Sequence, residues 1–227
     1  MRALDLFVGI DAPRAEALLQ GIDHFICAPR AIVYASREKA PFLYIVRSGL
    51  VKLSHFSLGG EERIVRILKA GDALGLEALF GEPYHHTARA LTEARLCRVP
   101  VPLLEQLDRE VPDFHRQLLR QFQRSLNEAE AVLTDLSTGT ARGRVARLLL
   151  FLARDHGAAE CTLIGREDMG AILGITTESA SRVIAAFRRL GIFGRSKGGL
   201  CECDLERLGE IARGIEPTPR KTLNKPP

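Results

Sequence analysis

Glycines and apolar residues alternate across residues 166–193 in an order that few folds can accommodate. Gly170 lies where one helix would contact another, and Gly174 follows four residues later. Two helices that cross nearly at right angles need a small residue at their contact, a glycine at the turn and apolar residues facing inward on both sides. That inward set is present, as Met169, Leu173, Ile175, Ala180, Val183 and Ile184. The pattern predicts a helix-turn-helix whose second helix begins at Thr176 or Thr177.

The second predicted helix carries polar residues on the face that does not point inward. A helix in the major groove reads bases with its first turns, so we predict Glu178, Ser181 and Arg182 as base readers. The Arg182 guanidinium can donate two hydrogen bonds to guanine, and Glu178 can accept a hydrogen bond from cytosine. Their spacing of four also allows the carboxylate to hold the guanidinium, as in an ordinary surface ion pair. Thr177 and Arg188 are expected to support DNA contacts.

The segment GIFGRSKGGLCECDLERL predicts a strand, a basic glycine-rich tip and a second strand, which together form a wing. Arg195 and Lys197 suit phosphate contacts that position the module without reading sequence. Cys201 and Cys203 alternate with Glu202, so both are expected to face the core. A CxC pair with no second pair is assigned a structural role rather than a metal or redox role.

Residues 31–99 consist of short β-rich runs separated by glycines. Turn signals at Gly49, at Gly59 and Gly60, and at Gly71 lie about ten residues apart. This spacing favours an antiparallel roll or barrel. With helices elsewhere in the 227 residues, the predicted fold class is α+β.

A long helix is predicted after the roll, at residues 115–136, where apolar residues recur at heptad spacing. The seam positions are Leu119, Phe122, Leu126, Ala129, Leu133 and Leu136. Six such positions with polar flanks favour a symmetric dimer helix, although one helix packing on its own domain remains the alternative. Residues 137–140 interrupt the pattern with glycine and hydroxyl residues, as a hinge would.

The distribution of charge and the number of cysteines limit which partners and which cell compartment the sequence favours. Residues 1–136 hold 17 basic and 18 acidic residues, and residues 137–227 hold 15 and 10, so the net charges are −1 and +5. The positive part favours a polyanionic partner. No export signal or apolar run of about 18 residues is present, so we expect a cytoplasmic protein without a membrane span. Most of the five cysteines are then expected to be buried thiols, without a disulfide framework, and no enzyme motif is apparent.

In its order of parts, the chain resembles the cyclic AMP receptor protein and fumarate/nitrate reduction regulator (Crp/Fnr) superfamily of bacterial transcription regulators. The resemblance covers residues 25–211 and includes LYIVRSGLVKL, LKAGDALGLEALF, ARLCRVP and TTESASR. Glu178, Ser181 and Arg182 match the Glu-x-x-Ser-Arg pattern of the fumarate/nitrate branch, whose half-site resembles TTGAT. The resemblance implies a homodimer on a pseudo-palindromic double-stranded DNA site, with RNA polymerase as a further partner.

The resemblance also implies a domain plan. Residues 1–112 are expected to form an effector-sensing roll of the cyclic-nucleotide-binding type, residues 113–136 a dimerisation helix, residues 137–215 a winged helix-turn-helix and residues 216–227 a disordered tail. A ligand-binding regulatory subunit of a signalling enzyme is the rival interpretation, since similar rolls occur there. The helix-turn-helix after the seam argues against it.

The expected effector pocket departs from the cyclic AMP branch. In that branch a glycine-glutamate pair holds the ribose and an arginine-serine pair holds the phosphate. Here Gly75 is followed by Leu76, and Glu77 comes one place late. His86 and Thr87 stand where arginine and serine are expected. Without that arginine, cyclic AMP is not the expected effector.

Metal cofactors are the other effector class in this superfamily. Cys97 matches the roll cysteine of the iron-sulfur branch, but only Cys27 precedes it, and two thiolates cannot hold a [4Fe-4S] cluster. No metal site is therefore assigned. Haem stays open, because some regulators that this chain resembles sense nitric oxide or carbon monoxide through haem, and His85 and His86 are expected on the roll close to the dimer helix. The other imidazoles are His24, His55, His115 and His156. A small organic acid also stays open.

Overall fold

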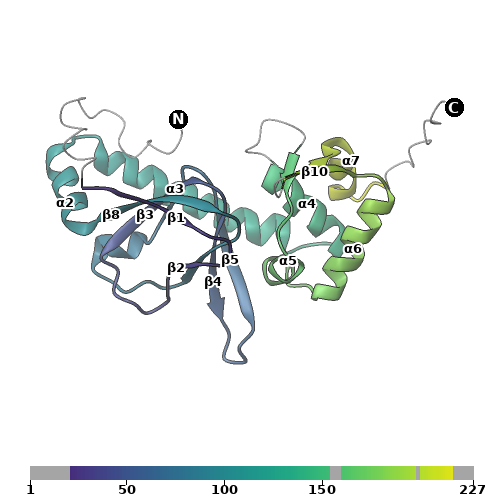
Figure 1. The fold of residues 1–227 in the computed structure, drawn as a ribbon, viewed down its shortest axis with the longest axis horizontal. Helices are drawn as coiled ribbons and strands as arrows, with labels where there is room; N and C mark the ends of the chain where they lie inside the picture. The colour runs from purple at the N-terminus through teal and green to yellow at the C-terminus, as the bar shows by residue number, and fades with distance from the viewer. Residues whose placement is uncertain (1–20, 154–159, 198–199, 217–227) are drawn as a thin grey trace. The chain divides into compact units, whose positions relative to one another are not determined.

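The computed structural model describes residues 21–153, 160–197 and 200–216. The chain divides into two compact units, residues 1–130 (unit 1) and 131–227 (unit 2), which are shown in Figure 1. The tail expected at residues 216–227 lies outside the described residues except for Glu216, and so does His156. No described helix is long and apolar enough to cross a membrane.

Unit 1 contains two four-stranded antiparallel sheets (Figure 1). The first has the order β1-β8-β3-β6 and the second β2-β7-β4-β5. The strands are β1 (Asp23–Cys27), β2 (Ile32–Tyr34), β3 (Phe42–Ser48), β4 (Val51–Phe56), β5 (Glu62–Leu68), β6 (Ala73–Leu74), β7 (Thr87–Ala90) and β8 (Ala94–Pro100). The predicted antiparallel roll is confirmed.

The roll turns where the sequence places glycines. Gly49, between β3 and β4, has φ +81°, and a Cβ there would lie 2.1 Å from the carbonyl oxygen of Glu93. Only glycine satisfies both the left-handed backbone and this close approach. After Gly75, a short 3₁₀ helix, η2 (Leu76–Phe80), lies between β6 and β7 along the chain.

Helix α2 (Val101–Glu110) follows the roll and leads into α3 (Phe114–Ala131). One side of α3 is buried in unit 1 through Phe114, Gln117, Leu118 and Gln121. The Gln121 amide donates a hydrogen bond to the carbonyl oxygen of Gly71 at 3.3 Å, which attaches the helix to a turn of the roll.

The long predicted helix changes character near its end. The α-helical part stops at Ala131, and η3 (Val132–Leu136) forms a π-helical turn that belongs to unit 2. Leu136 is only 3% exposed, because it packs in unit 2. The π-helical turn lies directly before the hinge predicted at residues 137–140, and such turns often lie at functional bends.

Unit 2 contains α4 (Ala141–Ala153), β9 (Glu160–Thr162), α5 (Arg166–Leu173), α6 (Thr177–Arg189), β10 (Phe193–Lys197), β11 (Leu200–Cys203) and α7 (Leu205–Ala212). Helices α5 and α6 form the predicted helix-turn-helix, and the hairpin β10–β11 forms the wing. Strand β9 extends the wing into a three-stranded antiparallel sheet of order β10-β11-β9. Both predictions for this segment are confirmed.

The expectation of buried thiols without a disulfide is wrong for one pair of cysteines. Cys161 of β9 and Cys203 of β11 form a disulfide, with their Cα atoms 6.2 Å apart. The residues are 42 positions apart, so only the pairing of β9 with β11 brings them together. Closing a loop of this length stabilises a fold by roughly 4 kcal/mol in the chain-entropy model. Cys27, Cys97 and Cys201 are free and buried, as expected.

Candidate nucleic-acid interface and effector cavity

The turn between α5 and α6 depends on two glycines, as predicted. A Cβ at Gly170 would lie 2.7 Å from the carbonyl oxygen of Ile175, so no larger residue fits where the helices meet. Gly174 ends α5 with φ 61°, and its N–H donates to the carbonyl oxygen of Gly170. This compact turn determines the angle at which α6 leaves α5.

Helix α6 begins at Thr177 with a side-chain cap. The Thr176 hydroxyl accepts a hydrogen bond from the N–H of Ser179 at 3.2 Å, which satisfies one of the unpaired groups at the helix start. Ala180, Ile184 and Phe187 are each at most 1% exposed and anchor one face of the helix. The opposite face is therefore presented to solvent.

All five α6 residues assigned to DNA lie on that solvent-facing side. Thr177, Glu178, Ser181, Arg182 and Arg188 are exposed, at helical spacings that place them on one stripe. The fold thus gives these side chains the accessibility that groove contacts require. Their individual roles as base readers and supporting residues stay predictions.

Glu178 is held by the helix start and not by Arg182. Hydrogen bonding to its own backbone N–H, and then to the Thr176 hydroxyl, lowers the pKa of Glu178, and the charge of Arg182 contributes least. No ion pair within 4 Å joins Glu178 to Arg182 in the described structure. The suggested carboxylate clamp on Arg182 is therefore absent, and both side chains remain available to a partner.

Arg166 is a candidate contact that sequence reasoning used only as a helix start. Burial, and then the positive charge of Arg188, lowers the pKa of Arg166. Two guanidinium groups thus act on each other near the end of α6, and a phosphate oxygen would relieve their repulsion. The sequence holds no signal for this pair, since the two residues are 22 positions apart on different helices.

The wing contributes β10, on which Arg195 and Lys197 occupy backbone positions of the strand. Their side chains lie outside the described part of the structure. Their assignment to phosphate contacts therefore stays a prediction.

Unit 1 contains a cavity of about 310 Å³ beside α3. Its lining consists of Leu53, Arg66, Leu74, Gly75, Leu76, Glu77, Phe80, Glu82, His85, His86 and Phe122. Four of the five predicted pocket residues, Gly75, Leu76, Glu77 and His86, are among them. Thr87 does not line the cavity, and its hydroxyl accepts a hydrogen bond from the N–H of Ser36 at 3.1 Å. A cavity of this size suits a small ligand.

Arg66 is the cavity residue that sequence reasoning missed. The argument against cyclic AMP concerned the arginine expected where His86 stands, and β5 supplies a different guanidinium, that of Arg66, to the cavity. Its Nη2 lies 3.1 Å from Oε2 of Glu128 on α3, and the two side chains are only 15% and 26% exposed. The Arg66 charge is thus already paired with the helix.

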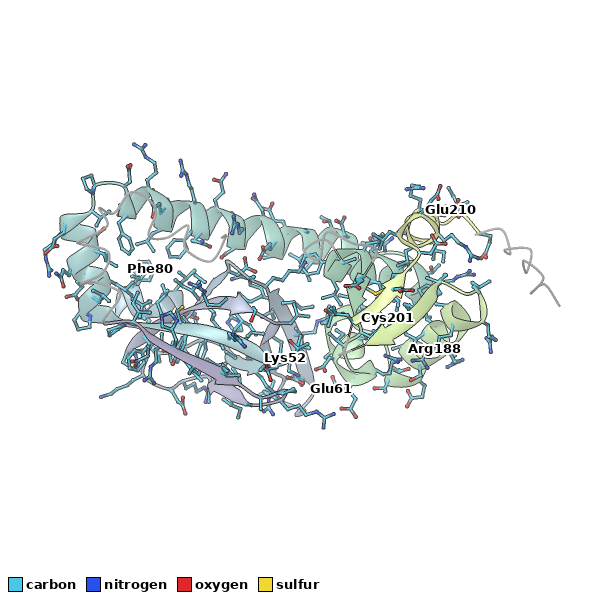
Figure 2. All side chains as sticks on the ribbon, turned by 45° about the horizontal axis from the view of Figure 1, so that its top comes forward. Lys52, Glu61, Phe80, Arg188, Cys201 and Glu210 are labelled. Atoms are coloured by element: carbon cyan, nitrogen blue, oxygen red, sulfur yellow. A yellow bond between two sulfur atoms is a disulfide. The ribbon has the colours of Figure 1, made fainter. Side chains whose placement is uncertain are left out.

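Aromatic rings cover another part of the cavity wall. Phe80 of η2 and Phe122 of α3 have ring centroids 6.0 Å apart, and Figure 2 labels Phe80 near the helix. Phe122 was assigned to the dimer seam, but it also lines this cavity. An apolar or aromatic part of a ligand would contact these two rings.

The cavity histidines differ in their surroundings. Burial lowers the pKa of His86, so its imidazole is neutral at pH 7. His85 is exposed, and its backbone N–H donates to Oε1 of Glu77 at 3.2 Å. Elsewhere in the roll, Sγ of Cys97 lies 3.2 Å from Nδ1 of His24. Among the described residues, no three His, Cys, Asp or Glu side chains gather as a metal site would require.

Comparison with known proteins places both units in one family. Residues 26–110 match the model of the cyclic nucleotide-binding domain, and residues 143–211 match that of the Crp-like helix-turn-helix domain. The chain is 31% identical to the transcriptional activator protein anr of Pseudomonas aeruginosa over 69% of its own length and 67% of that protein. It is 29% identical to the anaerobic regulatory protein of Aggregatibacter actinomycetemcomitans, over 71% and 65%.

A solved structure agrees with these matches. The CRP-family transcriptional regulator TTHB099 of Thermus thermophilus is 28% identical, with a TM-score of 0.71 over 85% of this chain and 98% of that one. The roll, the helix-turn-helix and the relatives thus all indicate the same class of protein. The chain belongs to the Crp/Fnr family of helix-turn-helix transcription regulators.

Proposed function

We propose that this chain is a cytoplasmic, homodimeric regulator that binds a pseudo-palindromic DNA site with TTGAT-like half-sites. The observation that carries the proposal is the exposed stripe of α6, which presents Glu178, Ser181 and Arg182 to solvent. Glu178 and Arg182 form no ion pair with each other in the described structure. An exposed helix face with an arginine and a carboxylate in its first two turns is suited to major-groove readout. RNA polymerase is proposed as a further partner, on the resemblance alone.

The dimer part of the proposal rests on α3 and the turn after it. Leu119, Leu126 and Leu133 recur every seven residues and are 56%, 60% and 68% exposed in the single chain. Leucines exposed at this spacing are typical of a helix that pairs with a second copy. Leu136 is buried in unit 2, so the exposed stripe ends at Leu133. Two-fold pairing would set the half-sites about 34 Å apart.

The effector part of the proposal rests on the cavity in unit 1. A ligand there would contact Arg66 on β5 and Phe122 on α3, so it would touch both the roll and the helix. If the ligand takes hydrogen bonds from Arg66, it competes with Glu128 for the guanidinium. Ligand binding would then favour a different arrangement of α3, which is the population shift that regulation needs. We propose a small molecule other than cyclic AMP as the effector.

Haem is the second candidate effector, and one observation favours it. His86 presents a neutral imidazole to a cavity whose remaining wall is largely apolar, and a neutral imidazole is the form that binds iron. His86 would therefore hold the iron, with Phe80 and Phe122 against the ring. Bound haem would supply a site for a diatomic gas. The visible spectrum of protein made with ample haem precursor and purified without oxygen tests this, since a stoichiometric Soret band is expected only for haem.

The DNA proposal is tested by fluorescence anisotropy with a labelled duplex that carries two TTGAT half-sites. A duplex with both half-sites scrambled is the control. We expect the matched duplex to bind at least about 1000-fold more tightly, with affinity falling steeply as salt rises. Equal, weak binding to both duplexes would contradict the proposal and favour the rival interpretation of a protein-docking regulatory subunit.

A further inference from the structure

The sheet of unit 2 gathers three cysteine side chains. Cys161 of β9 stands opposite Cys201 of β11 in the antiparallel register, and it is disulfide-bonded to Cys203, two residues further along β11. Alternate residues of a strand share a face, so Cys201 and Cys203 point to the same side. The three are 0%, 3% and 3% exposed. Figure 2 labels Cys201 on this sheet.

The disulfide closes a covalent ring of residues that contains the predicted DNA-reading part of unit 2. Residues 161–203 include α5, α6 and the first wing strand, β10. Cys203 pairs with Phe193 of β10, and the ring of Phe193 lies 6.3 Å from that of Phe187 in the buried face of α6. The link between β9 and β11 therefore supports the strand against which the reading helix packs.

We propose that Cys161, Cys201 and Cys203 form a thiol–disulfide site through which DNA binding by unit 2 responds to the thiol redox state. The inference rests on the proposed function, because a regulator that acts on DNA works in a thiol-reducing compartment. Disulfides that occur in such compartments are usually redox-sensing or catalytic rather than permanently structural. A hydroperoxide is the oxidant class we assign, and a dithiol the reductant class.

The two thiols become a disulfide by reaction with the peroxide alone, without a metal. The thiol of one cysteine, Cys161 or Cys203, loses its proton and attacks a peroxide oxygen, and the O–O bond breaks to give a sulfenic acid. The leaving hydroxide takes up the proton that the thiol lost and becomes water. The thiol of the other then attacks that sulfur, the S–O bond breaks and a second water leaves. Two thiols lose two electrons and two protons, and hydrogen peroxide accepts them. A dithiol reverses the change by two successive exchanges, and its own sulfurs become the disulfide.

Cys201 offers a second partner for Cys161. Its thiolate can attack the sulfur of Cys161 and release the thiolate of Cys203, an exchange that needs no oxidant. Burial raises the pKa of Cys201, so this residue is a thiol at neutral pH and attacks slowly. The Cys161–Cys203 disulfide is thus the form that persists. A Cys161–Cys201 disulfide is expected only when Cys203 is removed.

The test uses the full chain in two redox states. One sample is treated with hydrogen peroxide and the other with dithiothreitol, each is freed of reagent and alkylated, and the cross-linked peptides are identified by mass spectrometry. Anisotropy with the TTGAT-type palindromic duplex then gives the dissociation constant of each state. We expect a Cys161–Cys203 cross-link only after peroxide, and a dissociation constant about threefold or more higher in the reduced state, as the binding-competent fraction falls.

Three variants separate the site from a general effect of oxidation. Cys161→Ser should abolish the difference between the two states, whereas Cys201→Ser, which removes a buried thiol from the strand that carries Cys203, should retain it. Cys203→Ser should show a Cys161–Cys201 cross-link, which reports the site even if DNA binding is impaired. Circular dichroism confirms that each variant is folded.

The outcomes distinguish this inference from the proposed function. Equal affinity in both states, no Cys161–Cys203 cross-link after peroxide, or a folded Cys161→Ser variant that still responds would each overturn the thiol site. If neither state prefers the palindrome over scrambled DNA, the proposed function itself has failed. If both states prefer it equally, only the redox inference has failed.

Discussion

Arg66 of β5 and Glu128 of α3 form an ion pair, 3.1 Å between Nη2 and Oε2, across 62 residues of sequence. Nε of the same guanidinium is buried without a hydrogen-bond partner in the described structure. Removing the Glu128 carboxylate would leave the mostly buried charge of Arg66 unpaired, which destabilises the folded state. The pair therefore joins the helix that carries the exposed leucines to the strand that lines the cavity.

Glu128→Gln is expected to lower the free energy of unfolding by about 1–2 kcal/mol, because Arg66 would keep its charge in a mostly buried place without its ion-pair partner. Urea denaturation at pH 7 measures the effect. Glu105→Gln on α2 is the matched control, since Glu105 is exposed and has no ion pair with any described residue, and should change stability by less than about 0.5 kcal/mol. Equal effects of the two changes would argue against the pair.

Arg182→Ala should weaken binding to the matched duplex by about 1–3 kcal/mol and relax the preference at one G·C pair of each half-site. The reason is the loss of a bidentate contact to guanine. Competition between duplexes substituted at single positions measures this. A loss of affinity that is the same for every substituted duplex would mean that Arg182 contacts only phosphate.

Leu126→Arg should convert the proposed dimer into a monomer of 25.0 kDa. Two copies of Leu126 would each lose about 1.5 kcal/mol or more of burial, so the dimer dissociation constant should rise by about 100-fold. Light scattering after size-exclusion chromatography gives the mass. Leu58→Arg is the control, because Leu58 is fully exposed but lies in the β4–β5 turn. A variant at Leu126 that stays dimeric would place the dimer contact elsewhere.

Asp72 should make unit 1 less stable as pH rises. Burial, and then the charge of Glu128, raises the pKa of Asp72 to about 6, against 3.8 for the free group. The folded state therefore binds the proton more tightly, and stability present below about pH 4 is lost as pH rises through about 6. The Lys69 N–H, Arg66 and Arg124 oppose this shift.

Asp72→Asn isolates that contribution, since its side-chain oxygen can still accept the Lys69 N–H. Relative to the wild type, the variant should gain on the order of 2 kcal/mol between pH 4 and pH 7.5. Urea denaturation across this range gives the difference. A difference that does not vary with pH would show that Asp72 does not titrate as described.

Gly170→Ala should destabilise unit 2 by about 1–3 kcal/mol, because its Cβ would lie 2.7 Å from a backbone oxygen that cannot move without opening the turn. Gly209→Ala is the matched control, as Gly209 is also helical but its Cβ would meet only the end of the Arg213 side chain at 3.5 Å. That change should stabilise by about 0.5–1 kcal/mol. Thermal unfolding of the two variants compares them directly.

Local patterns in the sequence were sufficient to predict most of the fold. Gly170 and Gly174 required a tight helix crossing, and the alternation on either side of Glu202 required a strand with two buried cysteines. The same reasoning placed Glu178, Ser181 and Arg182 on an exposed face. These signals are readable because each depends on residues within a few positions of one another, where backbone geometry sets which side chains share a face.

What only the tertiary structure decided involves residues far apart along the chain. The Cys161–Cys203 bond spans 42 residues and the Arg66–Glu128 pair spans 62. Leu136 continues the heptad spacing, but the π-helical turn directs it into the core of unit 2 instead of the exposed stripe. Periodicity determines which face a side chain occupies on its own element, whereas strand pairing and helix packing determine which distant group that face meets. For this protein the sequence therefore determined the exposed helix that is predicted to read DNA, and the packing decided the cavity lining, the disulfide and the end of the exposed leucine stripe.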